Sequence, residues 1–220
     1  MFGATHIGRD HLRIGRNNQD GVFTSPRVAV VTDGCSSQPQ SEVGAQLGAR
    51  FLGQWLSTRS ELTADLPARA TDALCAYLYQ SVLALGPDVE PLLERYFLFT
   101  FLAAVRLGEG GMIFGLGDGA FLVDDALVRI EPGPDNAPPY CAYRLTSSGS
   151  RPEAQLHFSG PARRLAVMTD GLHHLDPQRL LSLMDEPGLH KNPLTLQRRL
   201  NVLAEAERFT DDATLALVGG

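Results

Sequence analysis

Two hydrophobic patterns divide the chain into helix-forming and strand-forming segments. Apolar positions at a helical spacing predict one helix over residues 41–57, with Ser41 as its N-cap, and a second, rich in Ala and Leu, over 67–85. Two amphipathic segments, 176–185 and 195–207, predict helices near the C-terminus. Short apolar runs rich in β-branched and aromatic residues lie between them and predict strands.

The predicted strands are separated by Gly-rich or Pro-containing turns. A hairpin around Ser25 and Pro26 ends at Asp33, and the segment 132–139, PGPDNAPP, predicts a loop. Further strands are predicted over 96–107, 111–125, 126–131, 140–146, 153–158, 163–171 and 211–219. Helices and strands do not alternate, so the order predicts an α+β fold with antiparallel sheets and helices outside them. The length of 220 residues favours a single domain over 1–220.

Composition and charge exclude several classes of function. The formal net charge is −6 and no basic run is present, which argues against nucleic acid as the main partner. No stretch approaches the roughly 18 apolar residues of a membrane span, and the first residues lack the apolar core of a signal peptide. We therefore expect a cytoplasmic protein without a membrane partner. Cys35, Cys75 and Cys141 are widely spaced and predict neither a disulfide framework nor a zinc site.

Acidic residues stand at the ends of several predicted strands. The sequences AVVTDG, ending at Gly34, and AVMTDG, ending at Gly171, each stop an apolar run on Thr-Asp-Gly. A single Asp-Gly is ordinary turn chemistry, but several carboxylates at the edge of a core repel one another unless a cation compensates them. Mg²⁺ and Mn²⁺ prefer such oxygen ligands. The acidic residues in question are Asp20, Asp33, Asp118, Asp170, Asp211 and Asp212.

Five motifs carry a resemblance to a known family. They are GATHIGRDHLRIGRNNQDG, VAVVTDGCSSQPQSEVGAQLGARF, GLGDGAFLV, RRLAVMTDGL and FTDDATLALV. In this order they resemble the metal-dependent protein phosphatase 2C family over nearly the whole chain. The resemblance implies a β-sandwich of two antiparallel sheets flanked by α-helices, with the metals in a cleft at one end.

The resemblance also implies a ligand set for two Mn²⁺ or Mg²⁺ ions and a third, weaker one. Asp33 would bridge the first two ions, with the backbone carbonyl of Gly34 on one of them. Asp170 would share the other ion with Asp211 and the third ion with Asp118. Asp20 would be a direct or water-mediated ligand.

The implied reaction is hydrolysis of phosphoserine or phosphothreonine on a protein substrate. A water molecule between the ions would attack the phosphorus in line, and the ions would neutralise charge on the phosphoryl oxygens. The resemblance assigns this chemistry to Asp33 and Asp170. Candidates for gripping the phosphate through a guanidinium are Arg13 and Arg16, between which the spacing does not decide.

The chain departs from the family at two positions. Gln19 stands where many relatives have Glu; we expect it to face the metals, the alternative being a hydrogen bond to a neighbouring loop. Cys35 stands where many relatives have a His, a proposed acid for the leaving group, and is a poor proton donor near neutral pH. His11, His173 and His174 are candidates to replace that acid, or ordinary surface or packing residues.

These departures leave a second function open. The intact carboxylates favour a metal-dependent serine/threonine protein phosphatase. Gln19 and Cys35 favour a catalytically weak or inactive relative that regulates a pathway or binds phosphorylated proteins.

Overall fold

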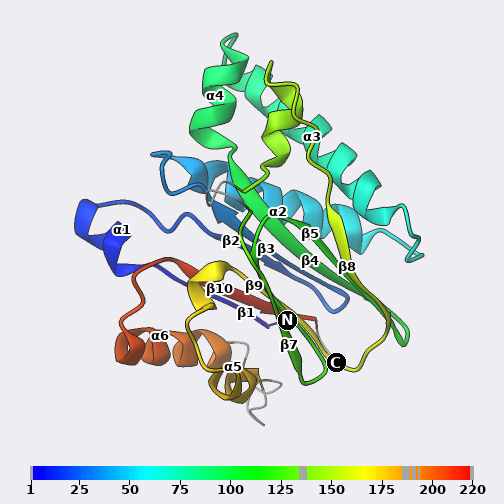
Figure 1. Ribbon diagram of the computed structural model, residues 1–220, viewed down its shortest axis with the longest axis vertical. Helices are drawn as coiled ribbons and strands as arrows, with labels where there is room; N and C mark the ends of the chain where they lie inside the picture. The colour runs from blue at the N-terminus through cyan, green and yellow to red at the C-terminus, as the bar shows by residue number, and fades with distance from the viewer. Residues whose placement is uncertain (1, 134–137, 185–188, 190–191, 193, 219–220) are drawn as a thin grey trace.

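The computed structural model describes residues 2–133, 138–184, 189, 192 and 194–218, and its strands form two five-stranded antiparallel sheets packed face to face (Figure 1). The first sheet has the order β1 (Phe2–His6), β10 (Ala213–Leu217), β9 (Leu165–Met168), β6 (Gly119–Val123) and β7 (Ala126–Ile130). The second has the order β2 (Gly21–Thr24), β3 (Val28–Gly34), β4 (Phe99–Leu107), β5 (Gly110–Leu116) and β8 (Gln155–Pro161). This sandwich confirms the predicted fold class.

Helices cover the outer face of each sheet (Figure 1). The β2–β8 sheet carries α2 (Ser41–Ser57), α3 (Leu66–Leu85) and α4 (Val89–Tyr96), and the other sheet carries α5 (Pro177–Met184) and α6 (Thr195–Glu207). Short helical segments are α1 (Arg9–Ile14), η2 (Cys141–Leu145) and η3 (Asp170–Leu172). None of the helices in the described part of the chain has the length and hydropathy that crossing a membrane requires.

The central strands are buried on both faces. Along β3, Ala29 and Val31 pack between the two sheets, whereas Val28 and Val30 face the helices. Successive side chains point to opposite faces of a strand, so both sets must be apolar. This explains why the sequence shows continuous apolar runs here.

The structure corrects two predicted strands. Segment 140–146 contains the 3₁₀ helix η2, because β8 occupies the edge of β5 and leaves this segment to pack against α3 and α4. Segment 111–125 holds two strands, β5 and β6, which belong to different sheets. The backbone turns at Gly117 and Gly119, whose φ angles are 108° and 127° and favour glycine.

Four elements have no predicted counterpart: β1, α1, α4 and η3, whose first residues fall in the predicted strand 163–171. The predicted helix over 41–57 is observed with the same bounds, and the second begins one residue earlier than predicted. Ser41 is the first helical residue and its hydroxyl donates to the carbonyl of Cys35, so the predicted side-chain N-cap is wrong. Part of the predicted 132–139 loop, residue 185 of the predicted 176–185 helix and residue 219 of the predicted 211–219 strand lie outside the described residues.

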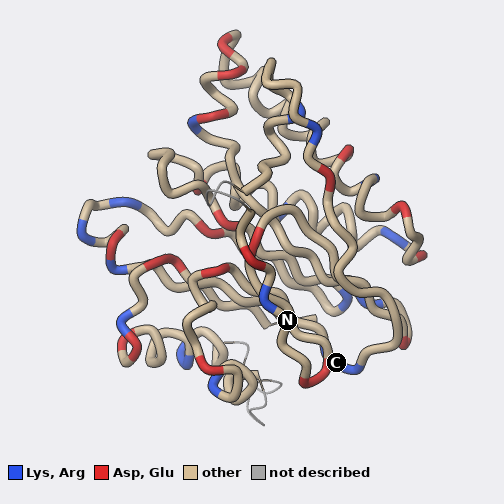
Figure 2. Tube along the Cα trace, in the orientation of Figure 1, with Lys and Arg blue, Asp and Glu red and all other residues tan. Residues whose placement is uncertain are grey.

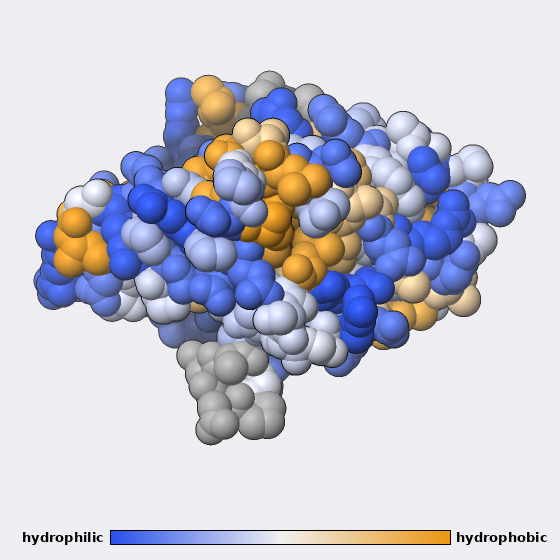
Figure 3. All heavy atoms as spheres, turned by 90° about the horizontal axis from the view of Figure 1, so that it is seen from above, coloured by the Kyte–Doolittle hydropathy of each residue, from blue (hydrophilic) through white to orange (hydrophobic). Residues whose placement is uncertain are grey.

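The side of the molecule that carries α4 exposes apolar side chains near its middle (Figure 3). The exposed large apolar residues of α2 and α3 include Val43, Leu47, Tyr79 and Leu83. Acidic segments gather instead where strands of the two sheets end (Figure 2). That gathering marks the candidate site.

Candidate metal centre

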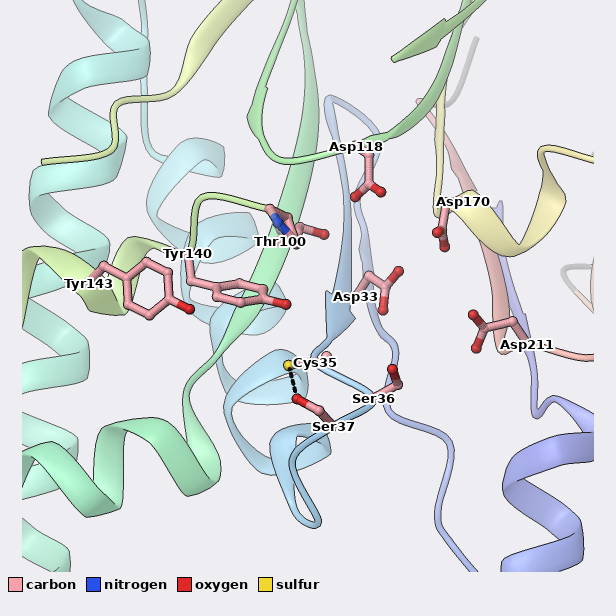
Figure 4. A pocket seen from close by; sticks show the side chains of 12 residues that line it. Asp33, Cys35, Ser36, Ser37, Thr100, Asp118, Tyr140, Tyr143, Asp170 and Asp211 are labelled. Carbon is pink, nitrogen blue, oxygen red and sulfur yellow. Dashed lines mark hydrogen bonds between the residues drawn. The ribbon is translucent and has the colours of Figure 1, made fainter. Parts of the chain in front are cut away.

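A cavity of about 360 Å³ opens where strands of the two sheets end. Four carboxylates line it: Asp33, Asp118, Asp170 and Asp211. They come from four different strand ends and turn toward the same space (Figure 4). The two Thr-Asp-Gly segments of the sequence therefore do meet at one site.

Asp33 enters the cavity because successive side chains of strand β3 point to opposite faces of the sheet. Ala29 and Val31 lie on the face of β3 that packs against the other sheet, and Asp33 follows on the same face, opposite Thr100 of β4. The apolar core ends at this level. Thr32 points to the helix side, where its hydroxyl donates to the carbonyl of Ala45 at 2.8 Å.

The glycine of each Thr-Asp-Gly segment permits a close backbone contact. A Cβ atom on Gly34 would lie 2.6 Å from the carbonyl oxygen of Gln19, and one on Gly171 would lie 1.9 Å from that of Asp212. Real Cβ atoms do not approach so closely. Each glycine thus allows another acidic motif to pack against the strand end.

Burial and mutual repulsion perturb the carboxylates. The pKa of Asp33 is raised well above its ordinary value, first by burial and then by the charges of Asp20 and Asp170. Burial also raises the pKa of Asp118 and of Asp211, and Asp170 adds repulsion to both. Without a cation, this group of charges costs free energy.

Two carboxylate oxygens at the site are buried without a hydrogen-bond partner: Oδ1 of Asp20 and Oδ1 of Asp170. Buried polar atoms normally have a partner, so these oxygens are available to a ligand. Their chemistry, together with that of the cavity carboxylates, suits Mg²⁺ or Mn²⁺.

The side chains do not form a closed ligand shell as they stand. Among the described residues, no three His, Cys, Asp or Glu side chains are grouped tightly enough to hold one ion by themselves. The four carboxylates instead surround a cavity wide enough for ions that keep several water ligands, as Mg²⁺ commonly does. The donor set therefore fits a hydrated divalent cation better than a dehydrated one.

Asp20 lies behind the cavity. It is 3% exposed and its Oδ2 accepts a hydrogen bond from the hydroxyl of Thr169 at 2.9 Å. Burial raises the pKa of Asp20 well above its ordinary value, and the charges of Asp212 and Asp211 add to this. Asp20 thus joins the site electrostatically although it does not line the cavity.

Asp212 holds the N-terminal motif in place. Its Oδ1 accepts a hydrogen bond from the backbone nitrogen of Gly8 at 2.7 Å, and its Oδ2 accepts from that of Gln19 at 2.6 Å. Oδ2 also lies 2.8 Å from Nδ1 of His11. The sequence marked Asp212 only as an acidic residue, and its function as an anchor could not be read from the motif.

The three histidines considered as proton donors lie in different surroundings. None of them is among the residues that line the cavity. His11 is 7% exposed and is held by Asp212. His173 lies near Asp118 and offsets part of the burial-raised pKa of that carboxyl, and its Nε2 is buried without a partner. His174 packs edge-on against Phe209, with 5.1 Å between ring centroids.

The two candidate phosphate-binding arginines are now distinguishable by position. Arg16 donates from Nη1 to the carbonyl of Ser36, a residue that lines the cavity. Arg13 is exposed and pairs with Asp10 at 3.2 Å. Arg16 is therefore the one at the rim of the site.

The amide nitrogen of Gln19 is bound by the loop after β3. Its Nε2 donates to the carbonyl of Gln38 at 2.8 Å and to the hydroxyl of Ser41 at 2.7 Å. The side chain ties the loop after β3 to the start of α2. Gln19 does not line the cavity, and its Oε1 is buried without a hydrogen-bond partner. The contacts of Nε2 support the alternative, a hydrogen bond to a neighbouring loop.

Two tyrosines form a wall of the cavity that sequence reasoning missed. Tyr140 and Tyr143 of the η2 segment point toward it, beside Cys35 (Figure 4). Burial raises the pKa of the Tyr140 hydroxyl, and contact with Cys35 adds to the effect. The segment resembled a strand in the sequence, so nothing in it indicated a cavity wall.

Comparison with solved structures identifies the class to which this fold belongs. The Mycobacterium tuberculosis serine/threonine phosphatase PstP is 21% identical with a TM-score of 0.68, over 98% of this chain and 96% of PstP. The catalytic domain of a serine/threonine protein phosphatase PstP in complex with two manganese ions is 20% identical with a TM-score of 0.65, over 98% of this chain and 95% of that one. Stp1 from Staphylococcus aureus is 14% identical with a TM-score of 0.67, over 98% of this chain and 92% of Stp1. The fold is thus that of bacterial serine/threonine phosphatases.

A sequence model of a protein family identifies the family to which the chain belongs. The model for protein phosphatase 2C matches residues 7–212, so the chain belongs to the protein phosphatase 2C family. The match begins within the first of the five motifs, ends within the last and contains the three between them in full. Comparison with curated proteins found no match.

Proposed function

We propose that this protein is a metal-dependent serine/threonine protein phosphatase that works with two Mn²⁺ or Mg²⁺ ions. One observation carries the proposal: four carboxylates from separate strand ends line a single cavity in a chain of the protein phosphatase 2C family. The structural relative PstP has been solved with two manganese ions. The candidate ligands of this chain are all oxygen atoms, and two of them are buried without a hydrogen-bond partner, which suits the same kind of ion.

Each carboxylate has a distinct role in the proposal. Asp33 would bridge the two ions, with the carbonyl of Gly34 beside it. Asp170 and Asp211 would hold the second ion, and Asp118 with Asp170 a third, weaker one. When bound, the ions would lower the pKa of water and neutralise the phosphoryl oxygens.

The other residues bind and orient the substrate. Arg16 at the rim is placed to receive a phosphate through its guanidinium, whereas Arg13 is paired with Asp10 away from the cavity lining. Tyr140 and Tyr143 form the wall beside which the phosphorylated residue would enter. Because none of the three candidate histidines lines the cavity, we assign protonation of the leaving serine or threonine oxygen to solvent in the cavity.

Hydrolysis assays test the proposal. Purified protein stripped with EDTA should lose hydrolysis of p-nitrophenyl phosphate and of a phosphothreonine peptide. Mn²⁺ should restore it better than Zn²⁺, because the candidate ligands are oxygens. Activity that survives chelation would refute the metal-dependent mechanism.

The second candidate, a catalytically weak phosphoprotein-binding relative, rests on two observations. Gln19 points into the loop after β3, and Cys35 occupies the cavity position where many relatives have a histidine. Mn²⁺-dependent binding of the phosphopeptide without turnover would favour this candidate over the phosphatase.

A further inference from the structure

Two cysteines that are distant in the sequence meet in the helical layer. Cys75 lies in α3 and Cys141 is the first residue of η2, and their sulfur atoms are 2.7 Å apart. Cys75 is 8% exposed and Cys141 is 1% exposed. Both thiols are free in the structure. The fold thus brings together a pair that the spacing in the sequence did not indicate.

The surroundings hold the pair in this arrangement. The thiol of Cys75 also lies 3.6 Å from the carbonyl oxygen of Cys141, and that of Cys141 lies 3.8 Å from the carbonyl oxygen of Thr71. Arg144, one turn after Cys141, pairs with Asp72 of α3 at 2.9 Å. This ion pair is a second link between η2 and α3.

We propose that Cys75 and Cys141 form a reversible redox pair that a peroxide oxidises to a disulfide. In the first step, the Cys75 thiolate attacks one peroxide oxygen. The O–O bond breaks, Cys75 becomes a sulfenic acid, and hydroxide leaves as water after protonation. In the second step, the Cys141 sulfur attacks the sulfenic sulfur, which releases a second water. Two thiols and one hydrogen peroxide thus give one disulfide and two waters.

Cys75 is the better first nucleophile. The hydrogen bond with Cys141 lowers the pKa of the Cys75 thiol, and the nearby Arg144 guanidinium lowers it further. The same bond and burial raise the pKa of Cys141. Cys75 is also the more exposed of the two.

The disulfide would act on the wall of the cavity. Tyr140 precedes Cys141 directly, and Tyr143 follows it within η2; both line the carboxylate cavity (Figure 4). A covalent bond to α3 would fix this wall to the helical layer. The proposal does not depend on the phosphatase function, since the bond can form in an inactive protein.

Peptide mapping tests the proposal directly on the full chain. The reduced protein is treated with hydrogen peroxide, and remaining thiols are alkylated under denaturing conditions. After trypsin digestion, we expect the peptides 70–95 and 130–144 to be linked, and dithiothreitol to separate them. The number of free thiols should fall from three to one, which leaves Cys35 in peptide 28–50. Links to Cys35, or sulfinic acid at Cys75 without the expected link, would overturn the proposal.

Thermal unfolding gives a second readout with a matched control. A disulfide restricts the unfolded chain, so oxidation should raise Tm by about 5–10 °C. The control variant Cys35→Ala should keep this shift, and Cys75→Ala and Cys141→Ala should lose it. If either variant fails to fold, peptide mapping of the wild-type chain still decides the outcome.

Discussion

The hydroxyl of Thr169 donates a hydrogen bond to Asp20 and so connects the ends of two facing sheets. Asp20 directly precedes β2, and Thr169 directly follows β9 of the other sheet. The same hydroxyl accepts a hydrogen bond from the backbone nitrogen of Thr214 at 2.9 Å. One small side chain therefore serves three segments of the site.

Replacing this hydroxyl by a methyl group tests its importance. Thr169→Val should lower the free energy of unfolding by about 1–3 kcal/mol, because it leaves the nitrogen of Thr214 and an oxygen of Asp20 without this partner. Thr169→Ser keeps the hydroxyl and should cost less. Urea unfolding of the three proteins provides the measurement, and equal stability of the Val and Ser variants would show that the hydrogen bonds contribute little.

Asp33→Asn should separate function from stability. Loss of the proposed bridging ligand should reduce Mn²⁺-dependent hydrolysis by more than about 100-fold, since even residues behind a ligand cost 10–100-fold. In EDTA, the same variant should melt at a higher temperature than the wild type. It removes a buried charge that Asp20 and Asp170 repel.

The stability gain of Asp33→Asn should depend on pH with a definite sign. Folding raises the pKa of Asp33, so the folded state binds this proton more tightly than the unfolded chain, whose aspartates titrate near pH 4. Wild-type stability from this group is therefore present at low pH and lost as pH rises toward the folded-state pKa. The gap in Tm between variant and wild type should widen with rising pH. The exposed Asp88→Asn serves as the control, and the idea fails if Asp88→Asn shows the same widening.

Gly171→Ala should damage the site through packing. Its Cβ would lie 1.9 Å from the carbonyl oxygen of Asp212, and relieving this clash should cost at least about 2 kcal/mol. Gly160→Ala is the matched control, because its Cβ would lie 3.5 Å from Phe158, an ordinary contact. Chemical denaturation compares the two, and a stable Gly171→Ala protein would mean that the close contact is relieved at little cost.

Gln19→Glu should destabilise the protein without tightening Mn²⁺ binding. A carboxylate cannot donate to Gln38 and Ser41, and it would place a charge next to the carbonyl of Gln38. The expected loss is about 1–3 kcal/mol. Calorimetric titration with Mn²⁺ measures the affinity, and exposed Gln54→Glu controls for the added charge. A clear gain in affinity would instead support a metal-facing side chain.

Elements with a long, regular pattern could be predicted from the sequence. The helix 41–57 has the same bounds in the structure as in the prediction, because its helical spacing is sustained over several turns. Segment 140–146 offered only a short apolar run, which suits a strand or a helical turn equally well. The conformation of this segment depends on the pairing of β8 with the edge of β5, and the local sequence does not indicate that pairing.

The carboxylates of the cavity were predictable for a similar reason. Asp33 and Asp170 each terminate an apolar strand, so their place at the edge of the core follows from local sequence. The contacts of Asp212 with Gly8 and Gln19 join residues that are 204 and 193 positions apart in the sequence. Such contacts exist only after the sheets have docked.

Because the carboxylates come from both sheets, the complete site can form only after both sheets have folded and packed together. Asp33 belongs to β3, whereas Asp170 and Asp211 adjoin strands β9 and β10 of the opposite sheet. A chain in which only one sheet has formed holds only part of the proposed ligand set. Affinity for a divalent cation would therefore appear late in folding, and an incompletely folded chain would lack part of the proposed site.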